Sequence, residues 1–181
     1  MKNLQYTLLF SILLSVGFIG NAQNKEIEPI IKDFGPVFEI KEMDFQVDTT
    51  LEYKAVFDIM NSPDENDKRN TWIETAARFL NMHVKNGVPA KQVKAVLVVH
   101  NKASKDLIIN EAYQKRYGTD NPNEKMIKAL LAADVQIIFC GQSSMARGFP
   151  KSELIPGVQL GLSAMTALIH FQNKDYQLIK F

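Results

Sequence analysis

The chain has 181 residues, of which 46% are hydrophobic and 23% are charged, and its formal net charge is +1 at pH 7. So small a charge excludes binding to nucleic acid or to an anionic membrane by bulk electrostatics. The sequence contains a single cysteine, Cys140, which excludes an intrachain disulfide and leaves packing to stabilise the fold.

Residues 1–22 have the pattern of a secretory signal peptide. Lys2 supplies the positive start, an apolar run follows from Leu8 to Ile19, and Gly20-Asn21-Ala22 is a small-x-small cleavage site. The apolar run is too short to span a bilayer. We predict cleavage after Ala22 and a periplasmic or secreted protein without a membrane anchor. One basic residue is lost with this segment, so the remaining chain has 20 basic and 20 acidic residues.

The first third of the mature chain contains a lead-in, a strand and a helix. Residues 23–51 are charged and broken by proline and glycine, which predicts an irregular lead-in that wraps the domain or a neighbouring subunit. Residues 52–60 (EYKAVFDIM) predict the first strand. Ser62-Pro63-Asp64-Glu65 is a helix-start signal, and apolar residues at helical spacing follow as far as Val84.

The remaining chain alternates strands with helices. We predict strands at residues 93–99, 135–139, 158–160 and 176–181, and helices at residues 105–117, from Pro122, after Cys140 and from Ser163. The strands are apolar along their whole length, which is typical of a mainly parallel sheet covered on both faces by helices. One α/β domain over residues 52–181 is therefore expected.

Cys140 is the strongest candidate for a functional residue. It lies where an apolar strand runs into a short helix, and the N-terminus of a helix favours thiolate, the reactive form of cysteine. The backbone N–H groups of Gln142 and Ser143 could hold an anion there, or these could be ordinary helix-start residues. Cys140 could equally be a small core residue, since free cysteines are often buried.

Other polar residues could join Cys140. His100 ends the strand at residues 93–99, and the carboxyl ends of parallel strands share one edge, so His100 could tune the thiolate, bind a ligand or simply end its strand. Arg147 could pair with an anionic sulfur species or with Cys140, or form a structural ion pair. Met145 could add to a soft-metal site suited to copper(I). No recognisable ligand spacing supports that site, so the prediction is no metal and no cofactor.

Several stretches together resemble the DsrE/DsrF-like family, in particular its exported bacterial members. The most specific is Cys140 followed seven residues later by Arg147-Gly148. The other matching stretches are Val96-Leu97-Val98-Val99-His100 with Ala103, Cys140-Gly141-Gln142-Ser143, Leu154-Ile155-Pro156-Gly157-Val158, the helix from Ser163 and Tyr176–Ile179. The resemblance covers residues 52–181. Relatives commonly have glycine at the position of Asn101, a residue that tolerates left-handed backbone angles better than most.

This resemblance implies a three-layer α/β sandwich with a five-stranded sheet, assembled as a homotrimer or homohexamer. It also implies that Cys140 takes sulfur from a donor as a persulfide and passes it to an acceptor protein. Three functions stay open: a sulfur carrier, a non-catalytic module that binds a small molecule or a soft metal, and an oligomeric structural protein with an inert cysteine.

Overall fold

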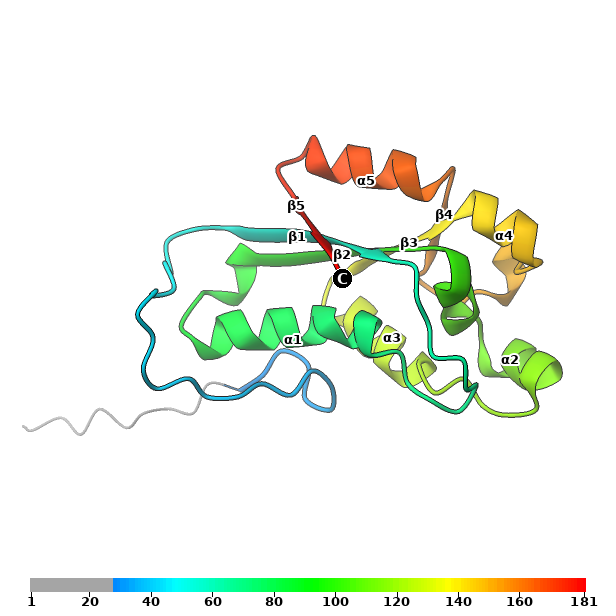
Figure 1. Cartoon of the computed structure of the whole chain (residues 1–181), viewed down its shortest axis with the longest axis horizontal. Helices are drawn as coiled ribbons and strands as arrows, with labels where there is room; N and C mark the ends of the chain where they lie inside the picture. Colours follow the sequence, from blue (N-terminus) through cyan, green and yellow to red (C-terminus); the bar gives the residue numbers. More distant parts are fainter. Residues whose placement is uncertain (1–27) are drawn as a thin grey trace, which may run out of the picture.

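A five-stranded sheet forms the middle of three layers in the computed structural model, which describes residues 28–181 (Figure 1). The predicted signal peptide lies outside these residues. The strand order is β4-β3-β2-β1-β5, and every pair is parallel, as the sequence predicted. The strands are β1 (Tyr53–Ile59), β2 (Val93–Val99), β3 (Gln136–Cys140), β4 (Gln159–Gly161) and β5 (Gln177–Lys180).

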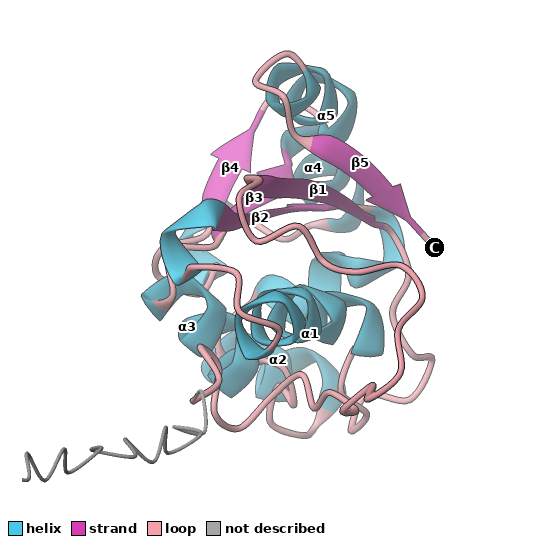
Figure 2. Ribbon diagram, turned by 90° about the vertical axis from the view of Figure 1, so that its left-hand side faces the viewer, coloured by secondary structure: helices cyan, strands magenta, loops and turns pink. Residues whose placement is uncertain are grey.

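Helices cover both faces of the sheet. On one side lie α1 (Thr71–Lys85), α2 (Asn110–Tyr117) and α3 (Glu124–Ala132), and on the other α4 (Gly141–Arg147) and α5 (Ala164–Gln172) (Figures 1 and 2). Short 3-10 helices span Ala90–Gln92, Asn101–Leu107 and Lys151–Glu153. Alternation along β2 sends Leu97 into the α1–α3 core and Val98 into the α5 core.

The apolar runs of the central strands are explained by this double cover, because β1, β2 and β3 have neighbours on both faces. Both edge strands differ from the prediction. Most residues of β4 and β5 are exposed or half-buried, because each strand has a neighbour on one side only and helix cover thins toward the sheet edges.

Helix α1 begins later than the Ser62-Pro63 signal predicted. Its cap is Asn70, whose side chain accepts hydrogen bonds from the backbone N–H groups of Trp72 and Ile73. Ser62 is used elsewhere, since its hydroxyl donates to buried Asp106 at 3.0 Å. The prediction was wrong because a tertiary contact took the capping group away from the helix start.

The predicted helix over residues 105–117 is divided. A 3-10 helix ends at Leu107, Ile108 forms an antiparallel bridge with Leu154, and α2 starts only at Asn110. Helix α3 likewise begins at Glu124 rather than at Pro122. The break lets Asp106 turn inward, where it is fully buried among polar side chains.

The described part of the lead-in, residues 28–51, contains no helix or strand. It packs along α1, where the Asn81 side chain binds the backbone of Ile31, Phe34 and Gly35. Gly35 has φ +67°, and a Cβ there would lie 2.3 Å from the backbone nitrogen of Arg78, so only glycine fits. Within residues 28–181, no helix has the length and apolarity that crossing a membrane requires.

Candidate functional site

Polar side chains from four strands form a row on the α5 face of the sheet. Asp58 lies in β1 opposite Val98, and Val98 and Cys140 belong to the core beneath α5. His100 follows Val98 by two residues in extended backbone, so it points to the same face. Lys180 pairs with Asp58 across β5 and β1. The row therefore runs Lys180, Asp58, His100, Cys140, in the order of the strands.

Asp58 ties together the first three members of this row. Its Oδ1 lies 2.7 Å from Nε2 of His100, and its Oδ2 lies 3.0 Å from Nζ of Lys180. Burial raises the pKa of the Asp58 carboxyl, but the hydrogen bonds and positive charges of Lys180 and His100 outweigh burial and hold its pKa below the usual value. Asp58 is thus ionised at neutral pH and can only accept hydrogen bonds, so Nε2 of His100 carries the proton.

This contact holds the His100 ring on the β1 side of β2. β2 lies between β1 and β3, so a ring that binds Asp58 leans toward β1, and its contact with Cys140 is not direct. Val99 pairs with Phe139, so the residues that follow them, His100 and Cys140, lie side by side with their backbones about 4.8 Å apart. As predicted, His100 and Cys140 lie at the same edge of the sheet.

The sulfur of Cys140 lies among hydrogen-bond donors. Burial raises the pKa of the thiol. Hydrogen bonds from the backbone N–H and hydroxyl of Ser143, and from the backbone N–H groups of Ala164 and Gln142, have a larger effect in the opposite direction. The pKa of Cys140 is therefore below its ordinary value. These groups stabilise the thiolate. The backbone N–H groups of Gln142 and Ser143, considered as anion donors from the sequence, therefore donate to the sulfur of Cys140.

Ser143 links the cysteine to the end of β2. Its hydroxyl oxygen accepts the backbone N–H of Asn101 at 3.1 Å, which frees the hydroxyl proton for the sulfur. Asn101 has φ +53°, the left-handed region where glycine is the usual residue. The Asn101 side-chain oxygen accepts a hydrogen bond from Arg147. Arg147 therefore holds the loop that positions Ser143, and it neither pairs with the sulfur nor forms an ion pair within α4.

Two glycines bring the covering turn against Cys140. A Cβ on Gly141 would lie 2.5 Å from the carbonyl oxygen of Gly161, and a Cβ on Gly161 would lie 2.9 Å from Ile138. This close approach lets the Leu162–Ala164 turn cover the sulfur, and Cys140 keeps only 5% of its surface exposed. A molecule that reacts with the sulfur must therefore be narrow, or it must approach along the surface groove beside this turn.

Metal-binding chemistry has little support at this edge. Across residues 28–181, no three His, Cys, Asp or Glu side chains gather in a way that could hold an ion. Met145 is 84% exposed on α4, whereas Cys140, which would share the soft-metal site considered as an alternative, is nearly covered.

Asp58 and Lys180 were not identified from the sequence. Asp58 breaks the apolar run of β1, and an acid at a position otherwise suited to a buried residue is the signal that could have found it. Lys180 has no such signal, because an exposed lysine in an edge strand is ordinary.

Residues 54–181 match the family model described as the DsrE/DsrF-like family. Two solved structures have the same fold: the protein of unknown function MTH1491 from Methanobacterium thermoautotrophicum, at 17% identity and a TM-score of 0.54, and the ychN protein from E. coli, at 16% identity and a TM-score of 0.53. Each similarity covers 71% of this chain and 99% of the other. No curated protein matches the chain.

Proposed function

The chain belongs to the DsrE/DsrF-like family, and we propose that it is an exported sulfur carrier that holds sulfur as a persulfide on Cys140. The observation that carries the proposal is the set of donors around the sulfur, which lowers the thiol pKa despite burial. An inert core cysteine has no need of such donors, and burial alone would raise its pKa. The paired His100 and Asp58 add a proton-transfer group on the same face of the sheet, one strand away from the cysteine.

The proposed reaction needs no oxidant or metal. The thiolate of Cys140 attacks the outer sulfur of a donor persulfide, R–S–SH; the new Sγ–S bond forms, the old S–S bond breaks, and R–S⁻ leaves. The proton stays on the transferred sulfur. In the reverse direction the persulfide of Cys140 gives that sulfur to an acceptor thiolate. His100, whose Nε2–H donates to Asp58, has its other ring nitrogen free to accept the proton of an incoming acceptor thiol.

We further propose that the protein acts after export and assembles from identical subunits. An apolar band on α5 and the turn before it supports the assembly: Leu162, Met165 and Ile169 are 71%, 72% and 59% exposed. Such a contiguous exposed band is typical of a protein interface. A donor or acceptor protein would have to approach the same edge, where Cys140 lies.

The burial of Cys140 favours a second reading, a structural protein whose cysteine is inert. Mass spectrometry distinguishes the two. Wild-type protein treated with an organic persulfide or with thiosulfate is expected to gain the mass of one sulfur atom, and reducing agent should remove it. Cys140→Ser should gain nothing and should melt at nearly the wild-type temperature.

Alkylation with iodoacetamide provides the second measurement. If the proposed function is correct, Cys140 of the folded protein reacts with iodoacetamide at pH 7 at least as fast as an equally exposed thiol of ordinary pKa. Protein that neither reacts while folded nor takes up sulfur would establish the structural reading. Circular dichroism of the Cys140→Ser variant controls for loss of fold.

A further inference from the structure

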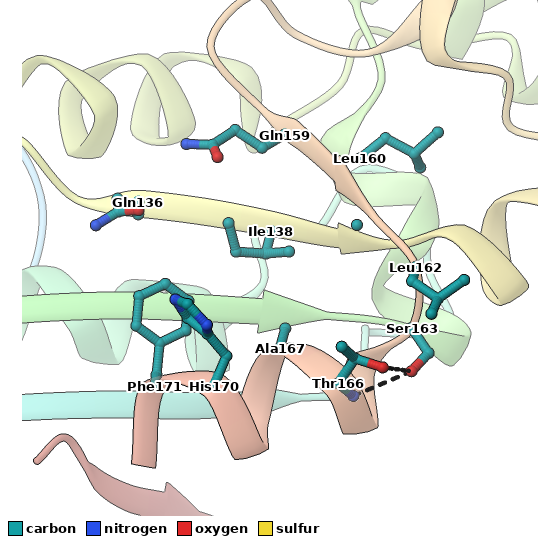
Figure 3. A pocket seen from close by; sticks show the side chains of 11 residues that line it. Gln136, Ile138, Gln159, Leu160, Leu162, Ser163, Thr166, Ala167, His170 and Phe171 are labelled. Carbon is teal, nitrogen blue, oxygen red and sulfur yellow. Dashed lines mark hydrogen bonds between the residues drawn. The ribbon is translucent and has the colours of Figure 1, made fainter. Parts of the chain in front are cut away.

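A groove runs along the sheet beside α5 and leads toward Cys140. It has a volume of about 280 Å³, and its floor is made by alternate residues of β3 and β4 (Figure 3). Gln136 and Ile138 come from β3, and Gln159 and Gly161 come from β4. These residues lie on the same face as Cys140, because Ile138 and Cys140 are two positions apart in one strand.

The groove has two different ends. Figure 3 shows Gln136, His170 and Phe171 at one end, and Leu162, Ser163 and Thr166 at the other. The second end adjoins the cysteine, because Gly161 pairs with Cys140 across the two strands. Since Cys140 lies four residues beyond Gln136, the distance along β3 from Gln136 to the cysteine is about 13 Å.

Polar side chains line the mouth of this groove and apolar ones line its depth. Ile138, Ala167 and Phe171 are buried, whereas Gln136, Gln159 and His170 are exposed. The side chains of Gln136, Gln159 and His170 form no hydrogen bond within the described part of the chain, so their donors and acceptors are free for a ligand. Ser163 and Thr166, by contrast, bind each other at 2.9 Å.

The polar mouth distinguishes the groove from the apolar band on α5. Met165 and Ile169 point outward one helical stripe away, and they suit a protein surface. The groove offers carboxamides and an imidazole at one end and an apolar floor in the middle, and its other end stops at the turn that covers the thiol of Cys140. Amide side chains pair with the amide and carboxylate groups of a peptide. A tripeptide spans about 10 Å when extended, which fits within the distance from Gln136 to the cysteine.

We propose that this groove binds a peptide-like thiol of low molecular weight, whose persulfide delivers sulfur to Cys140. The polar end of the molecule lies against Gln136, Gln159 and His170, and its sulfur lies at the end near Gly161. The sulfur step is that of the proposed function and rests on it: the Cys140–sulfur bond forms, the donor S–S bond breaks, and the peptide thiolate leaves. The binding itself does not depend on that step.

Binding is tested with S-methylglutathione, a tripeptide thioether that cannot transfer sulfur. Titrated into the isotopically labelled wild-type protein, it should shift the NMR signals of groove residues. The double variant Gln159→Ala/His170→Ala should weaken the affinity at least fivefold. Gln172→Ala, an exposed residue of the same helix outside the groove, is the matched control and should leave the affinity unchanged.

Sulfur loading from two donors tests the role of the groove. The double variant should load at least fivefold more slowly from glutathione persulfide and at the wild-type rate from thiosulfate, which is too small to use the polar end. Unchanged affinity and loading in the double variant overturn the proposal, as do ligand shifts confined to Met165 and Ile169. Tripeptide binding without sulfur loading from either donor would refute the proposed function alone. Thiosulfate loading without tripeptide binding would refute the groove alone.

Discussion

Asp106 makes a prediction that can be worked out in full. Its carboxylate is fully buried and accepts hydrogen bonds from Ser62 at 3.0 Å, Asn123 at 3.0 Å and Asn70 at 2.6 Å. All three donors are neutral. Burial raises the pKa of Asp106 from 3.8 to about 7, against the opposing effects of the hydrogen bonds and of the Lys105 charge. The change to test is Asp106→Asn.

The sign follows from proton binding. Between pH 3.8 and about 7 the folded protein holds a proton on Asp106 that the unfolded chain has lost, so stability falls as the pH rises through this window. Over the whole window the loss is about 4 kcal/mol, and from pH 5 to pH 8 it is about 2–3 kcal/mol. Asparagine does not titrate. It costs about 1–3 kcal/mol for an imperfectly paired amide, and that cost is the same at both pH values.

Urea unfolding at pH 5 and pH 8 measures the effect. The stability of Asp106→Asn relative to wild type should improve by about 2–3 kcal/mol on going from pH 5 to pH 8. Asp33→Asn, at an exposed carboxyl, should show no such change. A relative stability of Asp106→Asn that stays constant within about 0.5 kcal/mol would refute the argument that burial dominates at Asp106.

Three further predictions concern the site. Ser143→Ala removes a hydrogen bond from the sulfur and should raise the pKa of Cys140, seen as a shift of the pH profile of alkylation to higher pH; an unshifted profile contradicts it. Gly141→Ala would place a Cβ 2.5 Å from the carbonyl oxygen of Gly161 and should cost about 2 kcal/mol in urea unfolding, so wild-type stability would show that the turn can move. Asp58→Asn leaves the imidazole without its anionic partner and should slow transfer to an acceptor thiol about tenfold. An unchanged transfer rate would remove Asp58 from the mechanism.

The sequence alone determined the class of the fold. Central strands such as VKAVLVV have no polar alternation, and only a strand covered on both faces can be apolar throughout. The helix start at Ser163 was also predicted correctly, because the serine caps the helix that directly follows it and both features are local. Cys140 could be singled out because a strand runs directly into a helix there.

Long-range contacts decided the rest. Ser62 has the chemistry of a cap, but Asp106, 44 residues away, takes its hydroxyl, and Asn70 caps α1 instead. Arg147 likewise binds Asn101, 46 residues away in the sequence, rather than the sulfur.

The strand order was equally beyond local patterns. It puts β1 beside β2 and β5 beside β1, and so joins Asp58 to His100 and Lys180 across 42 and 122 residues of sequence. Hydrophobic periodicity reports which face a residue occupies, whereas the neighbours on that face depend on how the whole chain is wound. The sequence therefore identified the cysteine and its neighbouring donors Gln142 and Ser143, and only the tertiary structure added the Ala164 donor and the pairing of Asp58 with His100 and Lys180.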